Sequence, residues 1–238
     1  MGWRASAFVH IRQDHVSGST TAYAYPMQIT RLGHSCLLVE DDNARLLIDP
    51  GTYSHGFETL TGLTGILVTH QHPDHLDRSR LGEVLAKNPG VALYTDPQTA
   101  AMLQTDGMAA VAVAAGDTLP DLGTHVSVHG HDHAVIHCDL PVVDNVSYLI
   151  GGRLLHPGDA LLVPQTPVEI LALPAAAPWM AVKEAVDYHR TVSAAHAFPI
   201  HTSVLSDGGL ELHLRLLENL GPDGCAFHNP EHGQAMQF

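Results

Sequence analysis

The segment 70–75 could carry metal chemistry, because it places three histidines and one aspartate in the order H-x-H-x-D-H. Imidazole and carboxylate groups are the ligands that zinc and similar divalent ions take in proteins. His70 and His72 are two residues apart, so an extended segment points both rings the same way. The adjacent pair Asp74 and His75 needs a turn or a helix start to share that direction. The pattern therefore predicts a metal site.

Buried strands are expected to position these side chains. The apolar run 65–68 leads directly into the motif. Asp49 comes at the end of a predicted strand over 45–49, Asp159 follows a strand and a Pro-Gly pair, and His201 follows a predicted strand over 194–200. Side chains that follow strands gather at the rim of a sheet, which is where a shared site can form.

The motif resembles the signature of the metallo-β-lactamase-fold hydrolases, and the resemblance extends over nearly all of residues 27–238. The segment Gly33-His34-Ser35-Cys36 is most similar to the compact, ascorbate-phosphate lactonase-like branch. This resemblance implies an α/β (α+β) chain folded as a four-layer αββα sandwich. Two mixed sheets would then pack face to face, with the helices outside. The interleaving of helical and strand patterns points to the same architecture.

The resemblance also implies a set of ligands for two divalent metal ions, with zinc expected first and manganese or iron left open. His70, His72 and a third histidine would hold one ion, while Asp74, His75 and His201 would hold the other. Asp159 would bridge them. Asp74 and His34 are the expected catalytic residues, and His34 would act on the substrate or leaving group. Asp49 is expected to orient a ligand or a loop.

The third histidine is ambiguous, because several histidines lie in the right region. Gly130 indicates a bend near the rim, which breaks a simple alternation of side chains. His133 is favoured, since Gly130-x-x-His133-Ala134 resembles the third-ligand turn of the family. His131 is the second choice. The other two candidates are His129 and His137.

The predicted function is a metal-dependent hydrolase in which a hydroxide held between two metals attacks a small-molecule substrate. A carboxylic ester or lactone is the first choice of bond, and a phosphodiester is the second. One alternative is an iron-dependent thiol or persulfide oxidoreductase on the same fold. Diiron relatives usually carry glutamate at the position of His72, which favours hydrolysis. Another alternative is a metal-binding protein without turnover.

Helical patterns are expected over 76–86, from Asp96-Pro97 to 104, over 180–190 and over 210–220. Trp179, just before the third of these, is expected to pack as part of an amphipathic helix. One domain is expected over 27–238. Residues 1–26 have no sustained period and are expected to form a flexible or poorly packed leader.

The composition limits the partners. The net charge of −14 argues against a nucleic-acid partner, which needs a field of Lys and Arg. No segment reaches the ~18 apolar residues of a membrane span, so no membrane partner is expected. The three cysteines form no C-x-x-C pair, and Cys36 and Cys138 are expected as buried small hydrophobes. A cytoplasmic location fits, and a homo-oligomer is left open.

Overall fold

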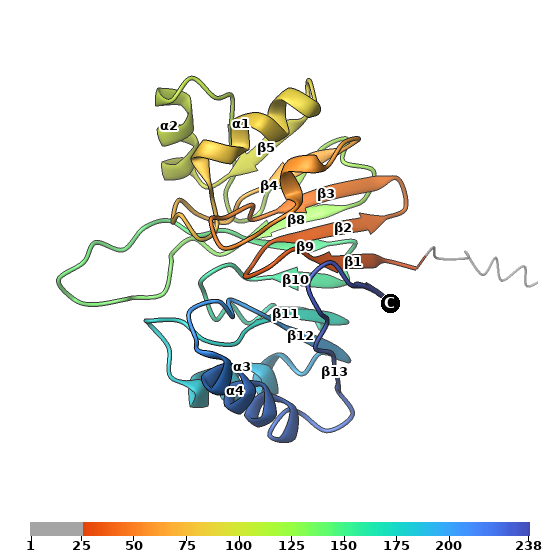
Figure 1. Ribbon diagram of the computed structural model, residues 1–238, viewed down its shortest axis with the longest axis vertical. Helices are drawn as coiled ribbons and strands as arrows, with labels where there is room; N and C mark the ends of the chain where they lie inside the picture. The colour runs from red at the N-terminus through yellow and green to blue at the C-terminus, as the bar shows by residue number, and fades with distance from the viewer. Residues whose placement is uncertain (1–25) are drawn as a thin grey trace, which may run out of the picture.

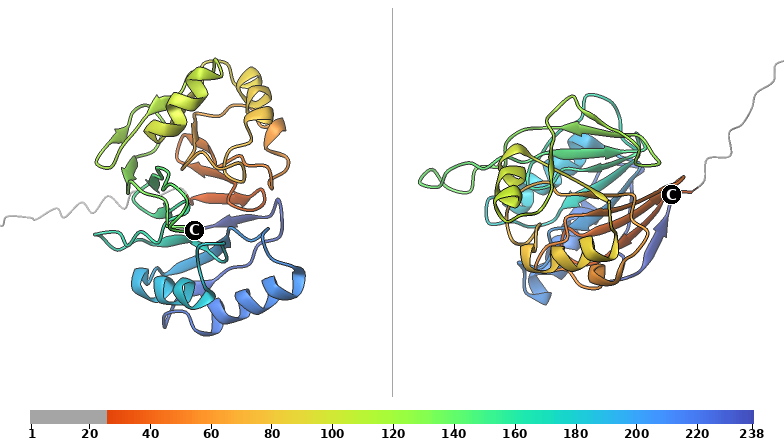
Figure 2. Two further views of the ribbon diagram at one scale, coloured as in Figure 1. Left: turned by 90° about the vertical axis from the view of Figure 1, so that its left-hand side faces the viewer. Right: turned by 90° about the horizontal axis from the view of Figure 1, so that it is seen from above.

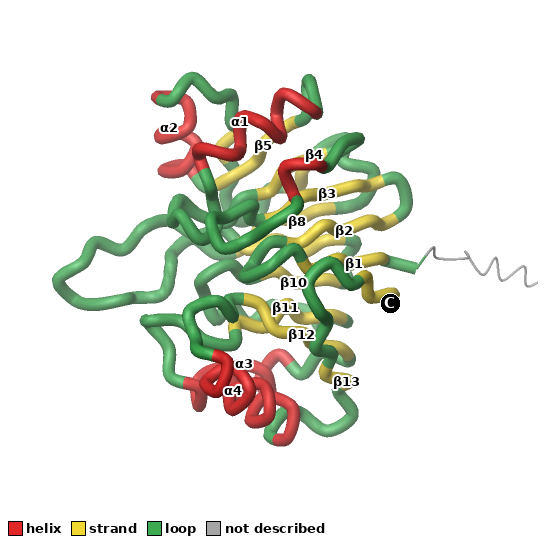
Figure 3. The backbone as a smooth tube through the Cα atoms, in the orientation of Figure 1, coloured by secondary structure: helices red, strands yellow, loops and turns green. Residues whose placement is uncertain are grey.

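Two sheets of seven strands pack face to face in the computed structural model, which describes residues 26–238 (Figure 1). The helices lie at the two outer faces, α1 and α2 over the first sheet and α3 and α4 over the second (Figure 3). The predicted four-layer αββα sandwich is therefore confirmed. The predicted leader lies outside the described residues, apart from Pro26. No helix among residues 26–238 is long and apolar enough to cross a membrane.

The first sheet has the order β14-β1-β2-β3-β4-β5-β6, with β3 to β6 parallel to one another. Helices η1 (Phe57–Thr59), α1 (Arg78–Lys87) and α2 (Pro97–Thr105) belong to this half. Its strands are β1 (Gln28–Arg31), β2 (Leu37–Asp41), β3 (Ala44–Ile48), β4 (Gly65–Leu67), β5 (Ala92–Thr95), β6 (Val111–Ala112) and β14 (Ala235–Gln237).

The second sheet has the order β13-β12-β11-β10-β9-β8-β7, and its strands β10 to β13 are parallel. Helices α3 (Val182–Val192) and α4 (Asp207–Asn219) cover it. Its strands are β7 (Thr118–Leu119), β8 (Val126–His129), β9 (Ser147–Ile150), β10 (Leu154–His156), β11 (Ile170–Pro174), β12 (His196–Ile200) and β13 (Ala226–Phe227).

Alternating side chains build three separate apolar layers. In β2, Leu37 and Val39 face the core between the sheets, whereas Leu38 faces α1 and α2. In β11, Ile170 faces the central core and Leu171 packs towards α3 and α4. Successive strand residues point to opposite faces, so a strand buried on both faces is apolar at every position. This burial holds the ends of the parallel strands rigid.

The predicted helices are confirmed within three residues at each end. The helix expected over 76–86 starts later, at Arg78, because the Asp77 side chain accepts hydrogen bonds from the backbone N–H groups of Ser79 and Arg80 and so caps it. The pairing of the C-terminal strand β14 with β1 was not expected from the sequence.

Candidate metal centre

The parallel strands of both sheets end at the same edge of the sandwich. The ends of β3 and β4 pair with each other, and Asp49 and Thr69 follow them at hydrogen-bonding distance. In the second sheet β10 leads to Asp159 and β12 leads to His201, and both strands pair in parallel with β11. Open sheets bind ligands beyond the carboxyl ends of their strands, so this edge is the natural place for a site.

Backbone strain gathers at this edge. His34, Asp49 and His201 have positive φ angles of 44°, 45° and 56°, in the left-handed region that residues other than glycine avoid. Each such residue costs on the order of 1 kcal/mol and persists only where the surroundings over-determine it. Close packing explains the glycine at position 158, because a Cβ there would lie 2.3 Å from Asn145 Oδ1. The loops of the site are therefore tightly fixed.

The turn expected at Asp74-His75 is present. The backbone N–H groups of His75 and Leu76 both donate to the carbonyl of His72, at 3.0 and 2.9 Å. This turn reverses the chain just before α1, so Asp74 and His75 share a direction that an extended strand would deny them.

The first cluster, called here the His70 group, consists of His70, His72 and His133, whose ligand atoms lie within 4.8 Å of one another. Nε2 of His70 is 3.0 Å from Nδ1 of His72. His133 Nδ1 donates to the carbonyl of Ala134 at 2.5 Å, which leaves Nε2 as the free nitrogen that faces the other two rings. The sequence separates these residues by 63 positions, but the fold places them around one point.

The second cluster, called here the Asp74 group, consists of Asp74, His75 and His201, again within 4.8 Å. His75 Nδ1 donates to Asp49 Oδ2 at 2.7 Å, and His201 Nδ1 donates to the carbonyl of Ala176 at 2.5 Å. Both rings therefore present an unprotonated Nε2 to the interior when they are neutral. Asp49 is placed as predicted, behind a histidine of the site.

Asp159 lies between the two groups. Its Oδ1 is 3.0 Å from His75 Nε2, and its Oδ2 is 3.2 Å from His201 Nε2 and 3.3 Å from His133 Nε2. Although they lie 3.0 to 3.3 Å from their neighbours, four of these buried atoms make no hydrogen bond of acceptable geometry, namely His75 Nε2, His133 Nε2, His201 Nε2 and Asp159 Oδ1. Buried polar atoms almost always make hydrogen bonds, so four that converge without doing so are what a set of metal ligands would look like. The donor set also suits divalent ions such as zinc.

The charges of the cluster stabilise one another. Burial raises the pKa of Asp74, but contacts with His201 and His34 outweigh it and hold that pKa well below its usual range. Burial lowers the pKa of His201, yet the carboxylates of Asp159 and Asp74 outweigh it and raise that pKa to about 9. Without metal, the cluster therefore holds protons on histidines at neutral pH. A metal ion that binds must displace them.

His34 is fully buried beside the Asp74 group. Its Nδ1 accepts the backbone N–H of Ser203 at 3.2 Å, so the ring proton sits on Nε2, which donates to Asp74 Oδ2 at 3.2 Å. Burial lowers the pKa of His34 to about 4, and the ring is neutral at pH 7. Both nitrogens are thus occupied by protein partners, an arrangement that orients Asp74.

A family model described as the Beta-lactamase superfamily domain matches residues 28–201. The chain belongs to the β-lactamase superfamily. The match spans residues 70–75, Asp159 and His201, so it covers all the candidate ligands.

Proteins similar to this chain come from several bacteria. Protein Rv0786c of Mycobacterium tuberculosis is 55% identical over 185 residues, which cover 76% of this chain and 86% of that protein. The UPF0173 metal-dependent hydrolase Atu1317 of Agrobacterium fabrum is 32% identical, covering 55% of this chain and 58% of that protein. A solved structure from Parabacteroides distasonis, described as a "Putative metal-dependent hydrolase", has a TM-score of 0.68 at 20% identity and covers 88% of this chain and 100% of that one.

The histidines of the 129–137 region separate clearly in this member of the superfamily. His133 is buried in the His70 group, whereas His131 is exposed and pairs with Asp132 Oδ1 at 2.7 Å. His137 is exposed and lies between Asp132 and Asp144, whose bridge closes a segment that projects from the body of the molecule (Figure 2). Cys138 is exposed in the same segment, so the expectation that it is buried was wrong.

Sequence reasoning missed several residues that support the centre. Thr69 donates its hydroxyl to Asp49 Oδ2 at 2.8 Å, and Asn145 Oδ1 accepts the backbone N–H of Asp159 at 3.0 Å. Trp179, expected as part of helix packing, instead precedes α3 and donates its indole N–H to Asp159 Oδ2 at 2.9 Å. No motif marks such contacts, because they depend on how distant loops approach one another.

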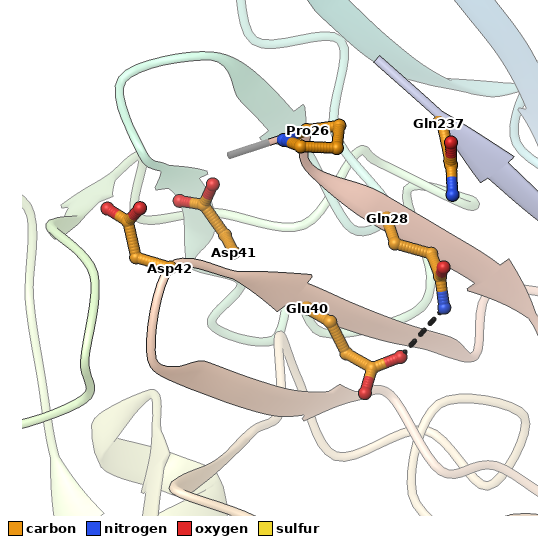
Figure 4. Close-up of a pocket in the computed structure, with 6 residues that line it drawn as sticks. All are labelled: Pro26, Gln28, Glu40, Asp41, Asp42 and Gln237. Carbon is orange, nitrogen blue, oxygen red and sulfur yellow. Dashed lines mark hydrogen bonds between the residues drawn. The ribbon is translucent and has the colours of Figure 1, made fainter. Parts of the chain in front are cut away.

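A hollow at the opposite edge of the first sheet does not belong to the metal centre. Figure 4 shows it between β1, the β2–β3 turn and β14, where Gln28 Nε2 donates to Glu40 Oε2 at 3.0 Å. The sheet register puts the pair Asp41–Ala44 at this end and Leu37–Ile48 at the end that leads to Asp49. The hollow and the histidines thus lie at opposite ends of the strands.

Proposed function

We propose that this chain is a hydrolase whose two divalent metal ions, zinc first, are held by the His70 group, the Asp74 group and a bridging Asp159. The observation that carries the proposal is the convergence of four buried, unpartnered nitrogen and oxygen atoms on one point. The relatives that bear the name metal-dependent hydrolase support the same class of activity.

Divalent ions at this point would supply Lewis acidity and lower the pKa of water. The protein itself holds the ligands in one orientation. The Nδ1–H groups of three histidines donate hydrogen bonds to protein oxygens, His75 to Asp49, His133 to the Ala134 carbonyl and His201 to the Ala176 carbonyl. These bonds fix the direction of each ring and leave Nε2 for the metal. His34 does the same for Asp74 by donating to its Oδ2.

A carboxylic ester or lactone of a small molecule is the substrate bond that fits best. The resemblance of Gly33-His34-Ser35-Cys36 to the lactonase-like branch favours a carbonyl substrate. A pair of divalent ions can act on a phosphoryl group as well, so the phosphodiester is the second choice.

The test is metal content of the purified chain by elemental analysis, followed by rates on esters, lactones and phosphodiesters. Asp159→Asn should retain the fold, lose at least one metal ion and lower the hydrolysis rate by about 100-fold or more, because a bridging ligand acts on both ions. Asp132→Asn is the matched control, since that aspartate is exposed and pairs only with His131.

Two results would contradict the proposal. One is full metal content and an unchanged rate in Asp159→Asn. The other is bound iron together with oxygen uptake in the presence of thiols and no hydrolysis, which would favour the redox activity instead.

A further inference from the structure

Trp179 makes the one hydrogen bond that a non-histidine side chain donates to Asp159 within the described residues. Its indole Nε1–H donates to Asp159 Oδ2 at 2.9 Å. Its ring lies edge-on to the His133 ring, with 6.1 Å between the centroids and 75° between the planes. The residue is only half-buried, so the indole closes one side of the centre while it remains in contact with solvent.

The segment that carries Trp179 is fixed to the same centre at a second point. The backbone N–H of Ala175 donates to the carbonyl of Ile200, and the carbonyl of Ala176 accepts His201 Nδ1–H. A bridge between Ala177 and Met180 then closes a tight turn around Trp179. The residues from Ala176 to Trp179 thus contact Asp159, His133 and His201, which follow three different strands.

Packing of α3 does not explain this placement. Trp179 precedes the helix, which starts at Val182, and it is not a member of the apolar cluster between the second sheet and helices α3 and α4. Its neighbour Met180 packs against that cluster instead. The two side chains of the turn therefore serve different purposes, and the indole faces the metal centre.

The indole N–H is a donor that can neither accept nor lose its proton at ordinary pH, so its bond to Asp159 has only one direction. It occupies Oδ2, the oxygen that lies within 3.3 Å of both His133 and His201. Oδ1 is left buried without a hydrogen-bond partner. A donor to one oxygen of a ligand carboxylate fixes its rotation and moderates its negative charge.

We infer that Trp179 is a positioning residue, which sets the rotation of Asp159 for metal binding and whose indole reports that binding optically. The inference rests on the proposed function only in that Asp159 must be a metal ligand. It does not depend on which substrate is hydrolysed.

The test is a zinc titration of chelator-treated protein, followed by competition with a chelating dye. The chain has two tryptophans, so Trp3→Phe leaves Trp179 as the single tryptophan, which light at the red edge of indole absorption excites without the tyrosines. Its emission should change in a saturable way as zinc binds. Trp179→Phe keeps an aromatic ring beside His133 but removes the N–H, and zinc affinity should fall by about 10- to 100-fold. Tyr53→Phe is the control, because Tyr53 is an exposed aromatic residue near His34.

The outcomes separate the two proposals. Zinc affinity in Trp179→Phe equal to that of the Trp3→Phe parent would overturn the positioning role, even if hydrolysis were found. The loss of affinity together with unchanged thermal stability of the metal-free protein would support it, even if no ester or lactone were hydrolysed. A parent chain that binds no zinc would overturn both proposals.

Discussion

Three histidines of the candidate centre point one ring nitrogen to the interior. The other ring nitrogen makes a hydrogen bond that orients the ring. His75 donates to a carboxylate, whereas His133 and His201 donate to backbone carbonyls. A backbone acceptor cannot rotate away, and the loop that carries it is fixed by the strand next to it. The direction of each ring is therefore set by the fold before any ion arrives, which is the usual role of the outer hydrogen-bond partners of metal ligands.

His133 and His131 lie two residues apart, and comparing them tests which one is the third histidine ligand. His133→Ala removes a ring whose Nε2 is buried without a partner, whereas His131→Ala removes an exposed ring. Zinc affinity, measured by competition with a chelating dye, should fall by about 100-fold or more in His133→Ala and stay within about twofold of the parent in His131→Ala. Equal losses in the two variants would mean that the third ligand has been assigned wrongly.

Among the elements, the buried strands that lead into the candidate ligands were predictable, and the pairing of the outermost strand was not. The apolar runs before His70 and His201 predict strands because each is buried on both faces. The strand β14 pairs with β1 from the other end of the sequence, which no local pattern can indicate. The hydrogen bond from Trp179 to Asp159 could not be predicted from the sequence for the same reason, since its two partners belong to separate loops.

The contact of α3 with α4 contains a titratable group that is unrelated to metal binding. His189 is 1% exposed, its Nδ1 has no hydrogen-bond partner, and Gly221 packs against the ring. Burial lowers the pKa of His189 to about 4. In the unfolded chain this pKa is about 6.5, so below that pH the unfolded state binds a proton that the folded state does not. Stability must therefore fall as the pH drops from about 6.5 towards 4.

Between pH 7 and pH 5 the free energy of unfolding should fall by about 2 kcal/mol more in the parent than in His189→Gln. The difference is due to the proton that His189 binds only in the unfolded chain. Urea denaturation with chelator present at both pH values measures the difference without a contribution from metal. His131→Gln is the control, because the same substitution is made at an exposed ring. An identical pH dependence in the parent and in His189→Gln would show that the buried ring does not limit stability in acid.

For the molecule as a whole, the candidate metal ligands come from both halves of the sandwich. His70, His72, Asp74 and His75 follow a strand of the first sheet, whereas His133, Asp159 and His201 follow strands of the second. Ions held by both sets, as proposed above, would bind the folded chain but not the separated strands of the unfolded one. Binding of that kind stabilises the folded state by about 2.7 kcal/mol when the free ion is at 100 times its Kd.

Removal of metal should therefore lower the midpoint of thermal unfolding by about 5 to 10 °C in a chain of this size. Differential scanning fluorimetry of the parent, with chelator and then with zinc restored, measures the shift. Asp159→Asn should show a much smaller shift, because it lacks the side chain that lies between the two groups. Asp132→Asn should match the parent, since its carboxylate pairs only with the exposed His131. If neither chelator nor zinc changes the midpoint of thermal unfolding of the parent, the ligands of the two sheets are not joined through bound ions.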